Sequence, residues 1–251
     1  MQELLWEPVM SETRRSNVVV VTGTDTGVGK TWVTAAIARA LQQAGVRVIA
    51  IKPVETGCGT TERAREDGVR LAAATGQAEP REALIRLAAP LAPVLAAERE
   101  GRTIDFDDLL IRIEGYAAAT DIVLLEGVGG LLAPITWEWC LVDIAQALEA
   151  RAVLVASDRS GSVNHALLTL GALELASVPV TDVVITSPDV PDASTGTNDA
   201  AIARLGGIAR IREATRTTDP EAAAAAMRPV AEALIAGVGA YAAEPGPAFP
   251  T

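Results

Sequence analysis

Nine residues near the amino end have the composition of a phosphate-binding loop. The stretch reads GTDTGVGKT, residues 23–31, and follows four consecutive valines at 18–21. Its glycines let successive backbone N–H groups converge on phosphate oxygens, and the start of a following helix adds a favourable dipole. In such a loop Lys30 reaches the β- and γ-phosphates, while Thr31 offers its hydroxyl to Mg²⁺. The sequence therefore predicts a site for a nucleoside triphosphate.

The loop departs from the common pattern at its beginning. The pattern G-x-x-x-x-G-K-S/T requires glycine at position 24, whereas this chain has Thr24 and an earlier Gly23. We expect the Thr24 side chain to contact whatever meets the γ-phosphate, and Asp25 to accept N–H bonds rather than to bind the metal. The loop residues expected to bind the nucleotide are Asp25, Thr26, Gly27, Val28, Gly29, Lys30 and Thr31.

Lysine itself is rare in this chain. Lys30 and Lys52 are the only lysines among 21 basic residues, the others being arginine. Because arginine supplies the other positive charges, we interpret the two lysines as functional rather than as surface charge. Lysine suits a phosphate site because its compact ammonium group offers three movable donors.

The elements that must hold these residues alternate along the chain. Continuous apolar runs rich in β-branched residues predict buried parallel strands, and apolar residues three or four apart predict helices. The sequence thus predicts an α/β fold, a doubly wound, mostly parallel sheet with helices on both faces and ligands beyond the carboxyl ends of the strands. The predicted strands span residues 17–23, 46–53, 121–127, 152–157 and 181–187, and the predicted helices 30–45, 104–119, 141–150, 163–177 and 220–241.

We expect one domain over residues 17–241. A disordered lead-in at 1–16 is expected before it and a disordered tail at 242–251 after it. Residues 57–103 form a long excursion between the second and third predicted strands, and the polar segment at 187–199 is predicted to be a surface loop.

The composition of the chain argues against several classes of binding partner. A net charge of −11 opposes binding to nucleic acid and to an anionic membrane surface. No apolar run reaches the roughly 20 residues that a membrane-spanning helix needs, and the first residues lack the pattern of a signal peptide. Two cysteines are too few for a disulfide framework and have no metal-ligand spacing. We therefore expect a cytoplasmic protein.

Four motifs follow one another along the chain. They are TGTDTGVGKT at 22–31, KPVETG at 52–57, LLEGVGGLLAP at 124–134 and GSVNHALLTL at 161–170. Together they resemble the dethiobiotin synthetases of the P-loop NTPase superfamily, over most of residues 17–215. The resemblance implies a ligase that joins CO₂ to 7,8-diaminononanoate with ATP and Mg²⁺, giving dethiobiotin, ADP and phosphate. In the family scheme one amine captures CO₂ as a carbamate, the γ-phosphoryl group passes to that carbamate, and the second amine displaces phosphate.

The resemblance implies roles residue by residue. Lys52 resembles the family lysine between carbamate and γ-phosphate, and Lys30 and Thr24 are its implied catalytic partners. The implied magnesium ligands are Thr31, Asp67 and Glu126. From the residues alone, Asp67 could also be an ordinary acid at a helix start, and Glu126 a solvated strand end. The implied substrate-binding residues are Thr24, Lys52, Thr56, Gly129, Gly161, Ser162, Val163 and Asn164.

The resemblance also implies a homodimer with shared sites. The start of the helix predicted at 163–177 has free N–H groups that can hold the far carboxylate of the substrate, and in the family this element comes from the partner subunit. His165 matches the family, but we interpret a lone histidine after a helix cap as structural. The stretch AAPLAPVLAA at 88–97 resembles the family's proline-rich segment near the interface, and Pro93 is expected to start a helix.

The resemblance weakens at the nucleobase end. Many family members have an Asn-Asp pair where this chain has Ser187 and Pro188, and Ala209 stands where a Gly-x-Ile-Pro stretch has proline. ATP is the expected co-substrate, and a relaxed choice of base is a hypothesis. The residues at the implied base-binding positions are Ser187, Ile208 and Glu213.

Three other interpretations are open. A nucleotide-switch ATPase of the ParA/MinD type would act through protein partners, but such loops carry a lysine near their start, where this chain has Thr24. An amidoligase for a large acid usually has an added glutaminase domain, and we expect no room for one beside the single predicted domain. A homologue that binds nucleotide without turnover would not be expected to retain Lys30, Thr31, Lys52 and Glu126.

Overall fold

The computed structural model describes residues 16–59 and 62–242, with the backbone alone for residues 238–242. The lead-in expected at 1–16, apart from Ser16, lies outside the described residues, as does the tail expected at 242–251, apart from Ala242. Among the described helices, none combines the length and apolar character needed to cross a lipid bilayer.

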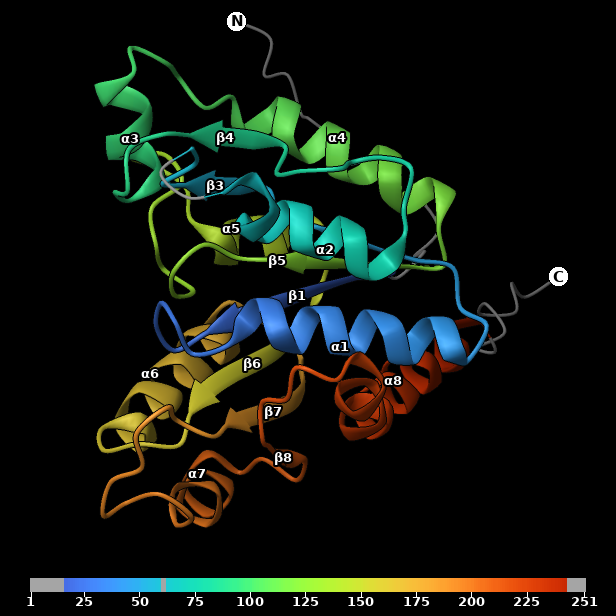
Figure 1. Ribbon diagram of the computed structural model, residues 1–251, viewed down its shortest axis with the longest axis vertical. Coiled ribbons are helices and arrows are strands. Elements are labelled where there is room, and N and C mark those ends of the chain that lie inside the picture. Colours follow the sequence, from blue (N-terminus) through green and yellow to red (C-terminus); the bar gives the residue numbers. More distant parts are fainter. Residues whose placement is uncertain (1–15, 60–61, 243–251) are drawn as a thin grey trace, which may run out of the picture.

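A six-stranded sheet runs through the described part of the chain (Figure 1). The strand order is β2-β5-β1-β6-β7-β8, and every neighbouring pair is parallel. All residues of β1, β2, β5 and β6 are buried, which explains their continuous apolar sequences. The strands are β1 (Val18–Gly23), β2 (Val48–Ile51), β5 (Ile122–Glu126), β6 (Arg151–Ser157), β7 (Val180–Thr186) and β8 (Ile211–Ala214).

Helices cover both faces of this sheet, which confirms the predicted doubly wound α/β class. On one face α1, α2 and α8 bury residues such as Ile37, Leu71 and Leu234 against the strands. On the other face α3, α4, α5 and α6 contribute residues such as Leu109, and α7 adds Ile202 beside β7. The helices are α1 (Lys30–Gln43), α2 (Asp67–Thr75), α3 (Pro93–Arg99), α4 (Phe106–Ala119), α5 (Leu141–Ala147), α6 (Ser162–Leu175), α7 (Asn198–Gly206) and α8 (Pro220–Ala242).

The described part of the excursion between β2 and β5 forms an insertion at the β2 end of the sheet (Figure 1). Two short strands, β3 (Val54–Thr56) and β4 (Ile85–Leu87), pair in parallel, and a short 3-10 helix, η1 (Arg63–Arg65), leads into α2. Gly68 in the first turn of α2 permits a close backbone approach, because a Cβ there would lie 2.2 Å from the Ala83 nitrogen. The insertion therefore fixes the first turn of α2 against the chain that leads into β4.

The predicted elements are confirmed, with shifts at their ends. The strand predicted at 46–53 is shorter, because β2 ends at Ile51 and leaves Lys52 just beyond the strand. The helix expected to start at Pro93 is α3. The loop predicted at 187–199 is confirmed except for its last two residues, which begin α7. Strand β8 and helix α7 are absent from the sequence prediction.

Candidate active site

The carboxyl ends of β1, β2 and β5 open onto a cavity of about 790 Å³. Its walls come from the phosphate loop after β1, from Lys52 after β2, from residues 128–130 after β5 and from the insertion. Doubly wound sheets bind ligands at this edge, and pockets for small molecules have volumes of roughly 300–1,000 Å³. The cavity is therefore the candidate site.

The phosphate loop turns directly into α1. Gly29 caps this helix with a φ of 97°, a left-handed conformation that glycine adopts without strain. The hydroxyl of Thr186, at the end of β7, donates to the carbonyl of Val28 at 2.7 Å and so fixes the loop against the sheet. Lys30 Nζ donates to the carbonyl oxygen of Asp25 at 2.8 Å across the loop. An anion at this helix start would meet both backbone N–H groups and the Lys30 ammonium.

The environment of Lys30 makes its charge sensitive to a bound anion. Burial, together with the positive charge of Lys52, lowers the pKa of Lys30 to about 8. The carboxylates of Glu126 and Asp67 raise the same pKa, but not enough to offset burial and the charge of Lys52. Because a phosphate in the cavity favours the charged form, phosphate binding and protonation of Lys30 are coupled.

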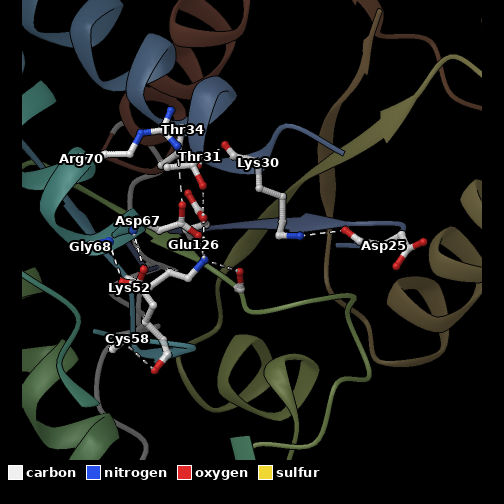
Figure 2. A network of polar contacts seen from close by, with 12 residues as sticks. Asp25, Lys30, Thr31, Thr34, Lys52, Cys58, Asp67, Gly68, Arg70 and Glu126 are labelled. Carbon is white, nitrogen blue, oxygen red and sulfur yellow. Dashed lines mark hydrogen bonds and ion pairs between the residues drawn. The ribbon is translucent and has the colours of Figure 1, made fainter. Parts of the chain in front are cut away.

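Lys52 and Glu126 form a buried ion pair between the ends of β2 and β5. Lys52 Nζ lies 2.7 Å from Glu126 Oε1 and 2.8 Å from Asp67 Oδ2. Lys52 is 3% exposed and Glu126 is 0% exposed. Figure 2 shows both carboxylates directed toward the Lys52 ammonium, while Lys30 points away from them. Burial alone would lower the pKa of Lys52, but Glu126 and Asp67 raise it above its usual value, so this ammonium stays charged.

Oxygen-bearing side chains around this pair fit a magnesium ion. Thr31 Oγ1 donates to Glu126 Oε1 at 2.8 Å, and Asp67 contacts the same ammonium as Glu126. Glu126 Oε2 is buried and accepts no hydrogen bond from the described residues. A buried carboxylate oxygen without a partner calls for an explanation, and a hydroxyl with two carboxylates is the hard donor set that Mg²⁺ prefers. Thr31, Asp67 and Glu126 could therefore hold this ion.

Glu55 positions the start of α2, and with it Asp67. Its carboxylate accepts the backbone N–H of Asp67 at 2.5 Å and that of Gly68 at 2.9 Å. Burial raises the pKa of Glu55, although these two N–H groups favour its ionised form. Sequence reasoning misses this residue because 12 positions separate it from Asp67, and within KPVETG it gives roles to Lys52 and Thr56 alone.

Nine of the 20 site residues predicted from the sequence line the cavity. Glu126 is buried and does not line the cavity, but it pairs with Lys52 on the cavity wall. The side chain of Val28 packs into the core beside α1 and does not line the cavity either. Thr24 and Asp25 belong to that loop without lining the cavity, and the Thr24 N–H donates to the Val155 carbonyl at 2.9 Å. The predicted residues on the walls are Thr26, Gly27, Gly29, Lys30, Thr31, Lys52, Thr56, Asp67 and Gly129.

The predicted base-binding residues are not brought together there. Ile208 packs against the apolar cluster of α6 and α7, and Glu213 is exposed on β8, so neither lines the cavity, and their role in binding the base stays a prediction. The segment that reaches the cavity is the one that follows β8, where Arg216 lines the wall. Ser187 lies beside that segment, with its N–H donating to the Ala214 carbonyl at 3.0 Å, but outside the cavity walls.

The start of α6 also lies outside this cavity. Gly161 caps the helix with a φ of 87°, and the predicted carboxylate-binding residues Ser162, Val163 and Asn164 form its first turn. Arg159, just before them, has its Nη2 3.5 Å from Asp25 Oδ2, which links this loop to the phosphate loop. The substrate role of this helix start stays a prediction.

The sheet, the glycine loop and the lysine-carboxylate site define a P-loop nucleoside triphosphate-binding protein. A family model described as an AAA domain matches residues 17–218. The cell division ATPase MinD of Pyrococcus furiosus has a TM-score of 0.55 at 16% identity, covering 87% of this chain and 98% of that chain. The MinC:MinD complex of Aquifex aeolicus has a TM-score of 0.52 at 18% identity, covering 93% and 98%. At these identities the likeness concerns the fold alone.

Sequence relatives narrow this class to one family. The ATP-dependent dethiobiotin synthetase BioD of Anaeromyxobacter sp. (strain Fw109-5) is 41% identical over 190 residues, which cover 74% of this chain and 84% of the relative. The protein of the same name from Aquifex aeolicus (strain VF5) is 32% identical over 190 residues, covering 76% and 85%. The chain belongs to the ATP-dependent dethiobiotin synthetase family, which confirms the resemblance carried by its four motifs.

Proposed function

We propose that this chain joins CO₂ to 7,8-diaminononanoate with ATP and Mg²⁺ and closes the ureido ring of dethiobiotin, releasing ADP and phosphate. The observation that supports this most is the buried Lys52–Glu126 pair on the same cavity as the phosphate loop. A cytoplasmic location is part of the proposal, because the reaction draws on ATP.

The reaction must bring two anions together. A carbamate approaches the γ-phosphoryl group, and their repulsion opposes transfer unless cations lie between them. In the proposal Lys30 neutralises the phosphates, and Lys52 donates to both the carbamate and the γ-phosphate. Glu126 and Asp67 support this role of Lys52, because they keep its pKa above its usual value.

Other residues of the site have proposed binding roles. Thr56 and Gly129, both on the cavity wall, contact the diamine. Thr24, in the phosphate loop but outside the cavity walls, has its proposed contact with the carbamate end of the substrate from the family resemblance alone. Mg²⁺, when bound, supplies a Lewis acid that draws charge from the phosphate oxygens. The proposed ligands, Thr31 and the carboxylates of Asp67 and Glu126, are supported by the unpartnered Oε2 of Glu126.

We propose that the active form is a homodimer. The diamine has a carboxylate at its far end, and the N–H groups of a helix start suit a carboxylate. Gly161, Ser162, Val163 and Asn164 provide such a start on α6, outside the cavity of their own chain. A second copy could present this helix start to the cavity, so each site would combine two chains.

One reaction mixture tests the proposed function. Purified protein is mixed with 7,8-diaminononanoate, bicarbonate, Mg²⁺ and ATP, and phosphate release is measured together with the mass of the product. We expect release that depends on the diamine and matches the dethiobiotin formed. Release at the same rate without the diamine would contradict the proposal and favour a nucleotide-switch ATPase.

The choice of base is a separate part of the proposal. Ser187 replaces the family's base-reading asparagine, and its hydroxyl lies 3.4 Å from that of Thr215. We propose that ATP is used without strict selection of adenine. Comparable turnover with ATP, CTP and GTP is expected, and a strict requirement for ATP would remove this part.

A further inference from the structure

Arg216 lines the candidate site, and the roles assigned above do not include it. It follows β8 at the carboxyl edge of the sheet, where its side chain is 29% exposed. Its Nη2 lies 2.6 Å from Oδ1 of Asp189, a carboxylate in the loop after β7. A cation thus stands on the cavity wall with a single acidic partner among the described residues.

The position of Arg216 is fixed relative to the phosphate loop. Trp32, in the first turn of α1, donates its Nε1 hydrogen to the Thr217 carbonyl at 2.8 Å, which ties the segment after β8 to this helix. The aliphatic stem of Arg216 lies beside Gly29, because a Cβ on Gly29 would be 3.5 Å from Arg216 Cδ. Gly29 caps α1, where backbone N–H groups can bind phosphate. The guanidinium therefore stands within reach of an anion at that helix start.

The partner of Arg216 is easily exchanged. The Asp189 side chain is 90% exposed, and ion pairs at such exposure contribute little because water screens them. A guanidinium, by contrast, matches phosphate with two parallel hydrogen bonds. A phosphate of a bound nucleotide can thus replace Asp189 at little cost.

The negative charge of a bound nucleotide also favours a contact with Arg216. A triphosphate with one Mg²⁺ retains roughly two negative charges. Lys30 can neutralise one of them, whereas the charge of Lys52 is shared among Glu126, Asp67 and, in the proposed reaction, both the carbamate and the γ-phosphate. Arg70, also on the cavity wall, lies 3.8 Å from Asp67, so Arg216 is the cation placed to offset the remaining charge.

We propose that Arg216 is a phosphate-binding residue that leaves Asp189 when a nucleoside triphosphate binds. The proposal rests on the proposed function only in that this cavity binds the nucleotide. Because phosphate is common to all nucleotides, the contribution of Arg216 is the same for every base. Asp189 competes with the ligand for Arg216, so the two partners act in opposite directions.

The test measures the Kd of ATP and of CTP by isothermal titration calorimetry with Mg²⁺ present. Arg216→Gln is expected to raise both values by the same factor, about tenfold or more. Asp189→Asn is expected to lower both, by about twofold to fivefold, since Arg216 is then free for phosphate. In the double variant, Asp189→Asn should not lower the Kd below that of Arg216→Gln alone, because no arginine is left for Asp189 to hold back.

Arg39 provides a matched control. Its side chain is 34% exposed and lies 3.6 Å from Glu221, whose side chain is 70% exposed, so it resembles Arg216 in exposure and pairing. Arg39→Gln should leave the nucleotide Kd unchanged. Equal effects of the two arginine substitutions would overturn the proposal, as would weaker binding in Asp189→Asn, which would show a purely structural pair. An effect of Arg216→Gln on one base alone would overturn it in favour of base recognition.

The outcomes separate this inference from the proposed function. If the unchanged protein binds no nucleotide, or if Lys30→Ala does not weaken binding, the nucleotide site itself is wrong. If binding is normal and requires Lys30 but not Arg216, only the present inference fails.

Discussion

Lys52 is the residue on which the proposed chemistry depends most. Its ammonium is buried between Glu126 and Asp67, yet its position beside the phosphate loop gives it access to the cavity. Burying one cation and two carboxylates costs desolvation free energy, which their mutual attraction often does not offset. Catalysis gives a reason for this arrangement that packing alone does not.

Replacing Lys52 should separate turnover from binding. Lys52→Ala removes a cation that acts on the reacting groups, so we expect kcat to fall by about 10²–10³-fold or more while the Kd of ATP changes less than about fivefold. Phosphate release and calorimetry measure the two quantities. Lys52→Arg should not restore the rate, because a broad planar guanidinium does not replace a compact ammonium.

Two controls distinguish a loss of catalysis in Lys52→Ala from a loss of folding. The unfolding midpoint of Lys52→Ala must be measured, since Glu126 and Asp67 lose their partner and the free energy of unfolding can fall by about 3–5 kcal/mol. The charge-retaining Lys52→Arg tests the same point with less loss of stability. If Lys52→Ala is folded but loses nucleotide binding as well as turnover, Lys52 binds the nucleotide itself rather than only the reacting groups.

Sequence reasoning identifies residues of the candidate site where the signal is local and misses them where it is not. Lys30 and Thr31 belong to one continuous motif, Lys52 directly follows a recognisable apolar strand, and Glu126 ends another. Arg216 is one of many arginines and follows a strand that the pattern does not reveal. Its place on the cavity wall depends on the tertiary fold.

At the scale of elements, α2 is positioned by a carboxylate from β3. Glu55 accepts the N–H groups of Asp67 and Gly68, and so acts as a cap contributed from outside the helix. The insertion therefore sets where Asp67 lies relative to Glu126. This contact links the proposed magnesium site to the small β3–β4 sheet.

Removing the cap should affect both stability and the magnesium requirement. Glu55→Ala is expected to lower the free energy of unfolding by about 1–2 kcal/mol, as loss of a helix cap does. Because Asp67 is then less well placed, the Mg²⁺ concentration for half-maximal rate should rise roughly tenfold or more. Urea unfolding and a magnesium titration of the rate are the measurements.

Asp105 offers the matched control for Glu55. Its side chain accepts the Asp108 N–H at 3.0 Å at the start of α4, a similar cap that does not line the candidate site. Asp105→Ala should lower stability by about 1 kcal/mol and leave the magnesium requirement unchanged. A rise in that requirement in both variants would show that general loosening, not Asp67, is responsible.

The loop after β7 is held to the start of α6 by Asp192. Its carboxylate accepts the backbone N–H groups of Ser160 and Ser194, both at 2.8 Å. The Ser160 N–H, followed by the hydroxyl and N–H of Ser194, lowers the pKa of Asp192 to about 2. The ionised form is therefore favoured in the folded protein.

This pKa predicts how stability depends on pH. The stabilisation by Asp192 is complete above its unfolded pKa of about 3.9 and is lost as pH falls toward about 2. The urea midpoint of the unchanged protein should exceed that of Asp192→Asn at pH 6, and the gap should close between about pH 4 and pH 2. A gap that stays constant across this range would contradict the assignment.

The fold could be predicted where strands are long and buried on both faces. Strands β1, β5 and β6 have continuous apolar sequences, so periodicity and composition identify them. Strand β8 reads Ile-Arg-Glu-Ala at the edge of the sheet, and such a short, charged stretch carries no strand signal. Its pairing with β7 is decided by tertiary contacts.

At the scale of the whole molecule, the proposed homodimer predicts complementation between two inactive variants. Lys52→Ala disables the cavity, and Asn164→Glu places a negative charge where the substrate carboxylate would bind, at a helix start that tolerates an acid. If each site combines two chains, a mixed dimer contains one intact site. Statistical pairing then restores about a quarter of the unchanged activity.

The measurement is the rate of dethiobiotin formation after the two chains are expressed together, with each variant alone as the control. Light scattering should give the mass of a dimer for all three samples. A mixture no more active than its components would show that each cavity works with residues of one chain.

The position of β1 in the sheet has a consequence for biosynthesis. Its neighbours are β5 and β6, so Val18 lies beside Val123, and Val19 beside Arg151. On a ribosome, the nascent valine-rich segment emerges long before either neighbour has been translated, and unpaired apolar strands of this kind are prone to aggregate. Strand order alone therefore leaves β1 without its second neighbour until Ser157 has emerged from the ribosome.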